Sequence, residues 1–159
     1  MKVARLMTVL VLWCLFGCGS TNNNQQQMPN SIQQQVAFNT QKQGDVPSLS
    51  YSTPRVDVIR NEADWDSYWN QLFANSLKPA LPSIDFQNTT VIAVLGGQYS
   101  SGGNSITINR IDITSAGAIV YATLGIPDQG VYVTATFTQP YHIVTISSTF
   151  TGTATLVLP

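Results

Sequence analysis

The pattern of apolar and polar positions divides the chain into three parts. Residues 6–16 are apolar except for Thr8, and residues 19–44 are rich in Asn, Gln, Ser and Thr. From about residue 45 onward, apolar residues recur at the periods of strands and of one helix. The pattern therefore predicts a short apolar leader, a polar spacer that buries little surface, and one folded domain.

One helix is predicted from Asn61 to about Asn75. Asn61 is a good N-cap, and acidic residues follow in the first turns, where the helix dipole favours anions. Apolar residues recur at helical spacing and form one stripe, which consists of Trp65, Tyr68, Trp69, Leu72 and Phe73. Such a stripe is able to line a ligand groove, but its spacing favours a face that is buried on a sheet.

The remaining elements are predicted to be strands. The run Val91–Leu95 is apolar throughout, as in a central strand that is covered on both faces. The alternating residues Ile106, Ile108, Ile111 and Ile113 predict another strand, and a change of phase at Asn109–Arg110 predicts a β-bulge within it. The other predicted strands are a short edge strand at Val36–Phe38, then Arg55–Arg60, Ile119–Ile126, Val131–Phe137, Ile143–Ile146 and Ala154–Leu158. The fold class expected is α+β, a mostly antiparallel sheet of about six or seven strands with one amphipathic helix packed on it.

The amino terminus has the features of an export signal. Two basic residues precede the apolar stretch, which is too short to span a bilayer because a helix needs about 20 apolar residues for that. The residues Leu15-Phe16-Gly17-Cys18 resemble the lipobox of bacterial lipoprotein precursors. This resemblance implies cleavage before Cys18 and attachment of diacylglycerol and further acyl chains, such as palmitate, to that cysteine. The alternative is an ordinary signal peptide with an unrelated cysteine near its end.

These features predict three segments along the chain. Residues 1–17 form a lipoprotein signal peptide, residues 18–44 form a lipidated Cys18 with an Asn/Gln-rich tether, and residues 45–159 form the domain. By resemblance to enteric sorting rules, Gly19 favours the outer membrane as the location. The expected localisation is the cell envelope, with the protein attached to the membrane through its lipid.

Composition excludes several classes of partner and site. Loss of the leader removes Lys2 and Arg5 from the 7 basic side chains and leaves 5 against 8 acidic ones, a net charge near −3. We therefore expect no nucleic-acid partner. The single histidine, His142, has no cysteine beside it in the domain and is interpreted as structural, so no metal site is expected. No catalytic motif is apparent, and neither a catalytic residue nor a cofactor is predicted.

The glycine-rich stretch 96–104 is the candidate recognition loop. It lacks the Lys-Ser/Thr pair of a phosphate-binding loop, and a strand rather than a helix follows it. Glycines there permit positive φ or the close approach of a partner's backbone. The candidate partner-binding residues are Gly97, Tyr99, Gly102, Gly103 and Asn104.

The order of features resembles the carboxy-terminal domain of the protease complex subunit PrcB family. It consists of a helix with Asp64-Trp65 and Trp69, then Ile84-Asp85-Phe86, the run Val91–Leu95, the glycines 102 and 103, and Pro140 before Ile143-Val144. This resemblance covers roughly residues 50–147. It implies a lipoprotein that assists or stabilises a partner at the cell envelope, in the named case a protease, and it supplies no catalytic residues.

Two other hypotheses compete with a protein-binding module. A glycan- or small-ligand-binding lipoprotein would use exposed aromatic rings, for which Tyr99, Tyr132 and Tyr141 are the candidates. An enzyme is the third hypothesis, and a Ser-His-Asp mechanism would require His142. The preferred hypothesis is that the protein is a membrane-anchored, non-catalytic module that binds another protein in the cell envelope.

Overall fold

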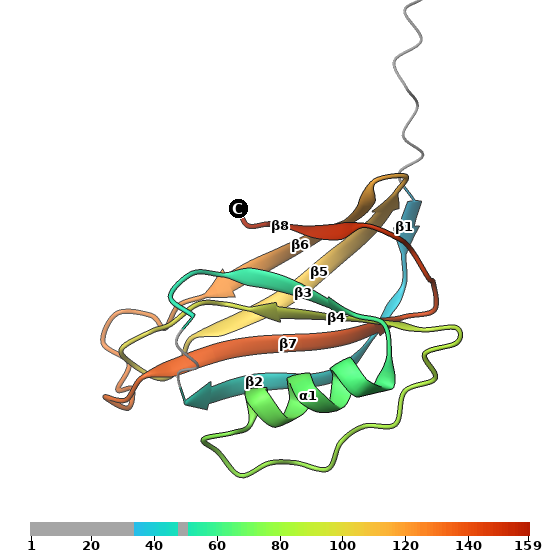
Figure 1. The fold of residues 1–159 in the computed structure, drawn as a ribbon. Helices are drawn as coiled ribbons and strands as arrows, with labels where there is room; N and C mark the ends of the chain where they lie inside the picture. The colour runs from blue at the N-terminus through green and yellow to red at the C-terminus, as the bar shows by residue number, and fades with distance from the viewer. Residues whose placement is uncertain (1–33, 48–50) are drawn as a thin grey trace, which may run out of the picture. The chain divides into compact units, whose positions relative to one another are not determined.

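The computed structural model describes residues 34–47 and 51–159, which fold into two four-stranded sheets and one helix (Figure 1). One sheet has the strand order β1-β5-β6-β8 and is called the β5 sheet below; the other has the order β2-β7-β4-β3 and is called the β4 sheet. The strand pairs are antiparallel except for β6 and β8, which are parallel. The elements are β1 (Gln34–Val36), β2 (Phe38–Pro47), β3 (Arg55–Ile59), α1 (Glu62–Leu72), β4 (Thr90–Leu95), β5 (Ser105–Thr114), β6 (Gly117–Gly125), β7 (Thr138–Ile146) and β8 (Thr153–Val157).

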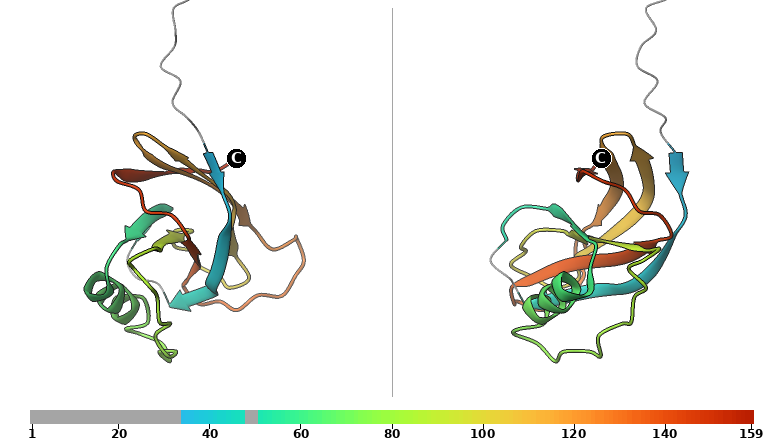
Figure 2. Two further views of the ribbon diagram at one scale, coloured as in Figure 1. Left: turned by 90° about the vertical axis from the view of Figure 1, so that its right-hand side faces the viewer. Right: turned by 45° about the vertical axis from the view of Figure 1, so that its right-hand side comes forward.

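The β5 sheet, the β4 sheet and helix α1 stack as three layers, with the β4 sheet in the middle (Figure 2). A hydrophobic core lies on each face of the β4 sheet, and alternate residues of β4 point into one or the other. Ile92 and Val94 pack against the β5 sheet, while Val91 and Leu95 pack in the core that contains the helix. Every residue of β4 and of β7 is buried. This double coverage explains the uninterrupted apolar run that predicted a central strand.

Helix α1 begins at the predicted cap. The side chain of Asn61 accepts a hydrogen bond of 2.8 Å from the backbone N–H of Asp64, which satisfies one of the free amides of the first turn. The predicted stripe faces the β4 sheet, and Trp65 and Trp69 are each 1% exposed. Both indole N–H groups donate to backbone carbonyls of the connector after the helix, at Pro82 and Pro79 respectively. The stripe is therefore a buried face and no ligand groove.

The predicted fold class is confirmed in its main features, with one correction. The described residues are mostly β with one short helix, but their eight strands form two stacked sheets, where one sheet of about six or seven strands was expected. The short strand β1 and the ten-residue strand β2 at the amino-terminal side account for part of the difference. The predicted bulge is present, since the pairing of β5 with β6 shifts register between Ile108 and Arg110.

Two segments differ locally from their predicted conformation. The polar stretch before residue 45 contains β1 and most of β2, because β2 pairs along its whole length with the buried strand β7 and needs few apolar residues of its own. The strand predicted at Val131–Phe137 is wrong: that stretch is an irregular loop, and β7 begins after it at Thr138. An alternating pattern forms a strand only when a neighbouring strand is available to pair with it.

The predictions for the amino terminus concern residues outside those that the structure describes. These are the signal peptide at residues 1–17, the lipidated Cys18 and the first part of the tether. In the described ranges 34–47 and 51–159, no helix combines the length and hydropathy that a bilayer crossing requires.

Candidate protein-binding site

Two loops meet at one end of the domain, on the left in Figure 1. The loop after β4 spans residues 96–104, and the loop after β6 spans residues 126–137; we call the two loops together the tip. The backbone N–H of Gly102 donates to the carbonyl of Thr134 at 3.0 Å. Tyr99 and Thr138 exchange two backbone hydrogen bonds of 2.9 and 3.0 Å, and the Thr138 hydroxyl donates to Ser101 at 2.7 Å. The first loop therefore holds the second in place.

The predicted recognition residues lie in the first of these loops, with different degrees of exposure. Gly97 and Gly102 are buried, Tyr99 and Asn104 are half-buried, and Gly103 is exposed. The Asn104 side chain donates to the carbonyl of Ser101 at 2.9 Å, within the same loop. The structure thus brings all five residues to the tip, and several of them pack against the molecule itself.

The glycines at positions 102 and 103 allow the two loops to approach closely. A Cβ on Gly102 would lie 2.5 Å from the Thr134 hydroxyl, and one on Gly103 would lie 2.9 Å from the ring of Pro127. Gly103 also has a φ of 83°, which side chains rarely adopt. The close backbone approach that the glycines suggested therefore occurs inside this chain, between its own two loops.

Exposed apolar side chains concentrate in the second loop. Eight large hydrophobic residues of the described chain are exposed, and five of them lie within residues 126–137. The others are two in the connector after α1 and one in β8. Tyr132 is completely exposed and Ile126 is 73% exposed. The five residues are Ile126, Val131, Tyr132, Val133 and Phe137.

The tip also has very little charge. Across the two loops the only charged side chain is Asp128. Soluble proteins usually cover an exposed cluster of this kind with a partner, because contiguous apolar surface in water is unfavourable. Sequence reasoning named Tyr132 only as a candidate for glycan binding and missed the other four. Ile126 was assigned to the end of one predicted strand, and the alternation of residues 131–137 was interpreted as another, half-buried strand.

The aromatic residues proposed for glycan binding do not form a common platform. Tyr141 is 3% exposed and packs edge-on against Phe73 in the core, and burial raises the pKa of its hydroxyl. Tyr99 is half-buried, whereas Tyr132 is completely exposed. A stacking site for sugar rings would require at least two accessible faces close together, so the three tyrosines give the glycan hypothesis no support.

His142 lies in the interior of the domain, where it connects the two sheets. Its Nδ1 accepts the backbone N–H of Ile108 at 2.9 Å, and its Nε2 lies 2.9 Å from the hydroxyl of Thr40. An Nδ1 that accepts leaves the ring proton on Nε2, so the imidazole is neutral and donates to Thr40. Burial lowers the pKa of His142, which favours the same neutral form. Both ring nitrogens therefore have structural partners.

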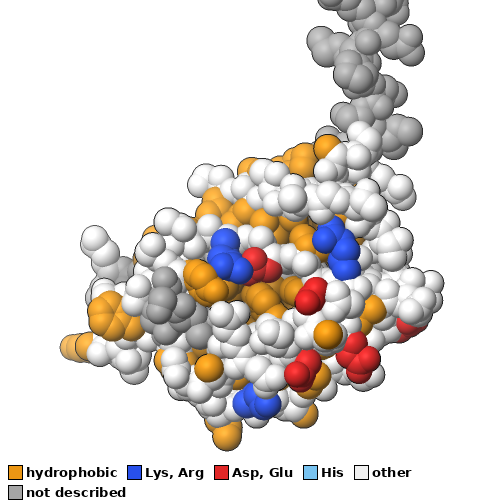
Figure 3. All heavy atoms as spheres, viewed as in Figure 1, with side chains coloured by type: hydrophobic (Ala, Val, Ile, Leu, Met, Phe, Trp, Pro, Cys, Tyr) orange, Lys and Arg blue, Asp and Glu red, His pale blue; other side chains and the backbone are white. Residues whose placement is uncertain are grey.

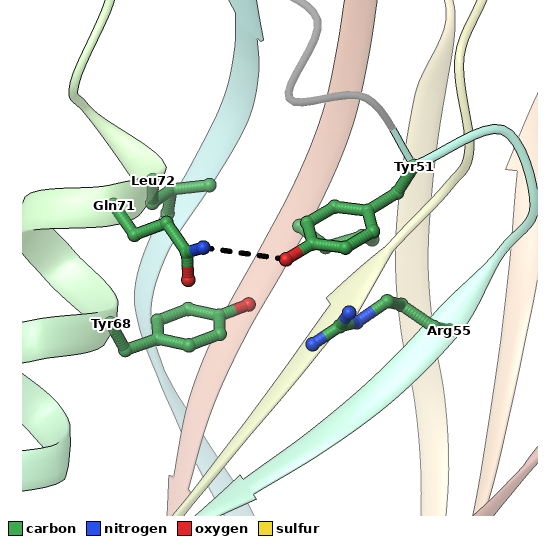
Figure 4. A pocket seen from close by; sticks show the side chains of 6 residues that line it. Tyr51, Arg55, Tyr68, Gln71 and Leu72 are labelled. Carbon is green, nitrogen blue, oxygen red and sulfur yellow. Dashed lines mark hydrogen bonds between the residues drawn. The ribbon is translucent and has the colours of Figure 1, made fainter.

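A small cavity lies between α1 and β3 (Figure 4). Its volume of about 10 Å³ is enough for about one water molecule. The buried Tyr68 hydroxyl points into it and has no hydrogen-bond partner among the described residues. Burial raises the pKa of Tyr68 well above its usual value, and the carboxylate of Asp57 adds to this effect. The guanidinium of Arg55 is paired with that carboxylate at 2.5 Å. The cavity is too small for an organic ligand.

A shallow hollow separates the edge strands β3 and β8. Figure 3 shows hydrophobic side chains exposed between basic ones on this face of the molecule. The hollow has a volume of about 320 Å³ and is lined by both strands, including Val56, Val58 and Ala154. Arg60 closes one end, since its guanidinium donates to the carbonyls of Phe150 and Gly152 at 3.1 and 2.6 Å. Arg60 thus connects the end of β3 to the segment between β7 and β8.

Within the described ranges, no cluster of three or more His, Cys, Asp or Glu side chains has the arrangement of a metal site. Most of the exposed large apolar side chains of the described residues lie at the tip. The described chain therefore forms a small α+β domain of two stacked sheets with an exposed apolar end. Residues 90–147 of the chain match the family described as PrcB C-terminal, which confirms the resemblance for this region. No curated protein and no solved structure matches the chain.

The matched region contains the strands that carry the tip. It runs from the start of β4 to the end of β7 and includes both loops, while the helix and β8 lie outside it. The similarity to the PrcB C-terminal family thus applies to the central strands and to the surface between them.

Proposed function

We propose that this protein is a lipid-anchored, non-catalytic accessory module of the bacterial cell envelope that binds a partner protein through the tip. The PrcB family suggests that the partner is a protease or part of a protease complex. The observation that carries the proposal is the group of five exposed apolar residues on the loop 126–137, held in position by the glycine-rich loop. Exposed apolar clusters of this kind are typical of protein interfaces.

The anchor is supported by the sequence alone. Cys18 follows a short basic and apolar leader in a lipobox-like context, and at least two acyl chains are needed for stable attachment to a membrane. We propose the outer membrane as the site of attachment, on the basis of Gly19. A Cys18→Ser variant is expected to incorporate no labelled palmitate and to leave the membrane fraction. Continued labelling of that variant would contradict the anchor.

The position of the tip suits a protein that is tethered at its amino terminus. Gln34, the first described residue, pairs with Ile113 near the far end of β5, whereas Ser105 at the near end adjoins the tip. The ten residues of β5 span about 30 Å at the usual rise per residue. A domain attached through Gln34 therefore presents the tip at its opposite end.

The proposal is tested by cross-linking in the cells that produce the protein. The wild-type chain, the tip variant Tyr132→Ser/Phe137→Ser and the control Leu77→Ser are expressed at equal levels and recovered after a reversible cross-linker. Leu77 is 96% exposed but lies away from the tip, so the control removes a comparable exposed side chain. The tip variant is expected to lose the cross-linked protein about tenfold or more, and the control to retain it.

Two readouts make this result decisive. Thermal melting of the three proteins should agree, because the substituted side chains are exposed and make few contacts in the fold. Identification of the cross-linked protein by mass spectrometry then shows whether it is a protease. Equal recovery with the tip variant and the control would reject the tip as the binding surface.

A further inference from the structure

The segment Val131–Phe137 has the sequence of a strand but lacks a neighbouring strand. Its apolar residues alternate with Tyr132, Thr134 and Thr136, and β-branched and aromatic side chains favour extended backbone. All seven residues are nevertheless exposed, and the chain bends at Ala135–Thr136. When local preference and the observed conformation disagree in this way, the disagreement often marks a functional site.

Backbone hydrogen bonds connect the end of this segment to the glycine-rich loop. Thr134 accepts from Gly102, and Thr138, the first residue of β7, exchanges two bonds with Tyr99, so Thr134 and Thr138 face that loop; Val131 donates to Asp128 within its own loop. Successive residues of an extended chain direct their backbone groups to opposite sides. In the extended form, Val133, Ala135 and Phe137 would therefore direct their N–H and C=O groups to the open side, where no described strand pairs with them.

The segment differs from the edge strands of the β4 sheet because it lacks features that prevent further pairing. Strand β2 carries Lys42 and a register shift between Thr40 and Lys42, and β3 carries the ion pair of Arg55 and Asp57. Charges and bulges of this kind prevent pairing with a further strand. Residues 131–137 contain no charged side chain, no bulge and no proline. Nothing in the segment opposes the addition of another strand.

We propose that residues 131–137 bind the partner by strand addition: an extended, uncharged segment of the partner pairs with the open side and straightens the loop. This inference rests on the proposed function and specifies the partner class for the same surface. Main-chain hydrogen bonds would supply affinity, and alternating apolar side chains of the partner would pack beside Val131, Val133 and Phe137. A partner segment with alternating Val and Thr residues has the required chemistry, because such a strand is uncharged and prefers extended backbone.

The test uses the full-length chain in detergent and a synthetic peptide of about seven alternating Thr and Val residues. Amide hydrogen exchange is followed by mass spectrometry for the peptic fragments that cover residues 126–138. The control peptide has the same sequence with an N-methyl group on every residue, which removes the donors of both edges. We expect the unmodified peptide to slow exchange at residues 131–137 by about tenfold or more, and the methylated peptide to have no effect.

Two variants of the chain distinguish backbone pairing from side-chain contact. In the extended form that the proposal requires, Ala135→Pro removes an N–H group on the open side, and Thr136→Pro is the matched control because its N–H group would face the glycine-rich loop. Protection by the peptide should be lost in Ala135→Pro and retained in Thr136→Pro. Equal protection in both variants, equal protection by both peptides, or no protection at millimolar peptide would overturn strand addition.

Other occupants of the surface give different results. Sedimentation of the full-length chain without peptide shows whether a second copy binds, and a dimer that is lost in Ala135→Pro would assign the open side to self-association and overturn a partner strand. The exchange experiment is independent of the cross-linking experiment above. Loss of cross-linking in the tip variant without peptide protection would retain the proposed function and reject this mode of binding.

Discussion

His142 is a polar residue that joins the β4 sheet to the β5 sheet. It lies on β7, is 3% exposed, and accepts a hydrogen bond from Ile108 on β5. Protonation of Nδ1 would remove that acceptor and place a charge in the interior, where desolvation is costly. The neutral ring is consequently part of the packing between the sheets.

The stability of the protein should therefore fall in mild acid. Burial lowers the pKa of His142 in the folded state, whereas the unfolded chain protonates it near the ordinary value of about 6.5. Below that pH the unfolded state binds more protons, so the free energy of unfolding decreases as the pH falls. Urea titrations at pH 8 and below pH 6 measure the difference. His142→Gln, which keeps an acceptor but does not titrate, should reduce it; an unchanged difference would exclude His142 as the cause.

At the scale of elements, helix α1 covers the outer face of the β4 sheet. Its two tryptophans pack against each other with ring centroids 5.0 Å apart, and Trp69 also packs on Phe73 at 4.7 Å. The indole groups donate to the connector that follows the helix. Helix, sheet and connector thus depend on the same side chains.

Replacement of Trp69 by Ala should cost about 3–5 kcal/mol of unfolding free energy, because a large side chain leaves the core and a cavity remains. The exposed neighbour Asn70 provides the control, and Asn70→Ala should change stability by about 0.5 kcal/mol or less. Urea unfolding followed by tryptophan fluorescence of the remaining rings measures both. A loss below about 1 kcal/mol for Trp69→Ala would show that the helix contributes little to the fold.

Local sequence patterns predict single elements of this fold but not how the strands are divided between the two sheets. Helix α1, the central strand β4 and the bulge after Ile108 are predicted from local patterns. These predictions succeed because the pattern of apolar residues in each segment agrees with the side chains that the fold buries. The partition into two sheets does not follow, because it depends on which strands pair over long distances. For the tip, the glycines indicated close approach, but only the structure identifies the loop 126–137 as the segment they contact.

At the scale of the whole molecule, the region of family similarity is smaller than the folding unit. Residues 90–147 include β4 and β7 but exclude α1, which covers their outer face, and β2 and β3, which pair with their edges. A central sheet that is buried on both faces cannot be stable when one cover is removed.

A fragment of residues 90–147 should therefore be unfolded or aggregated, whereas residues 34–159 should unfold cooperatively. Circular dichroism and thermal melting of the two fragments check this expectation. A cooperative transition in the shorter fragment would show that the four strands β4 to β7 form an independent core.

The placement of Gln34 and the tip at opposite ends of β5 has a mechanical consequence. If the domain is held at its amino terminus while a partner pulls on the tip, the load runs parallel to the strands. The hydrogen bonds between β1 and β5, and those between β2 and β7, then resist the load together, in shear, and cannot open one after another. The nine residue pairs of β2 and β7 make this the stronger connection. This shear geometry would let the proposed tethered module withstand a load between its amino-terminal attachment and a partner at the tip.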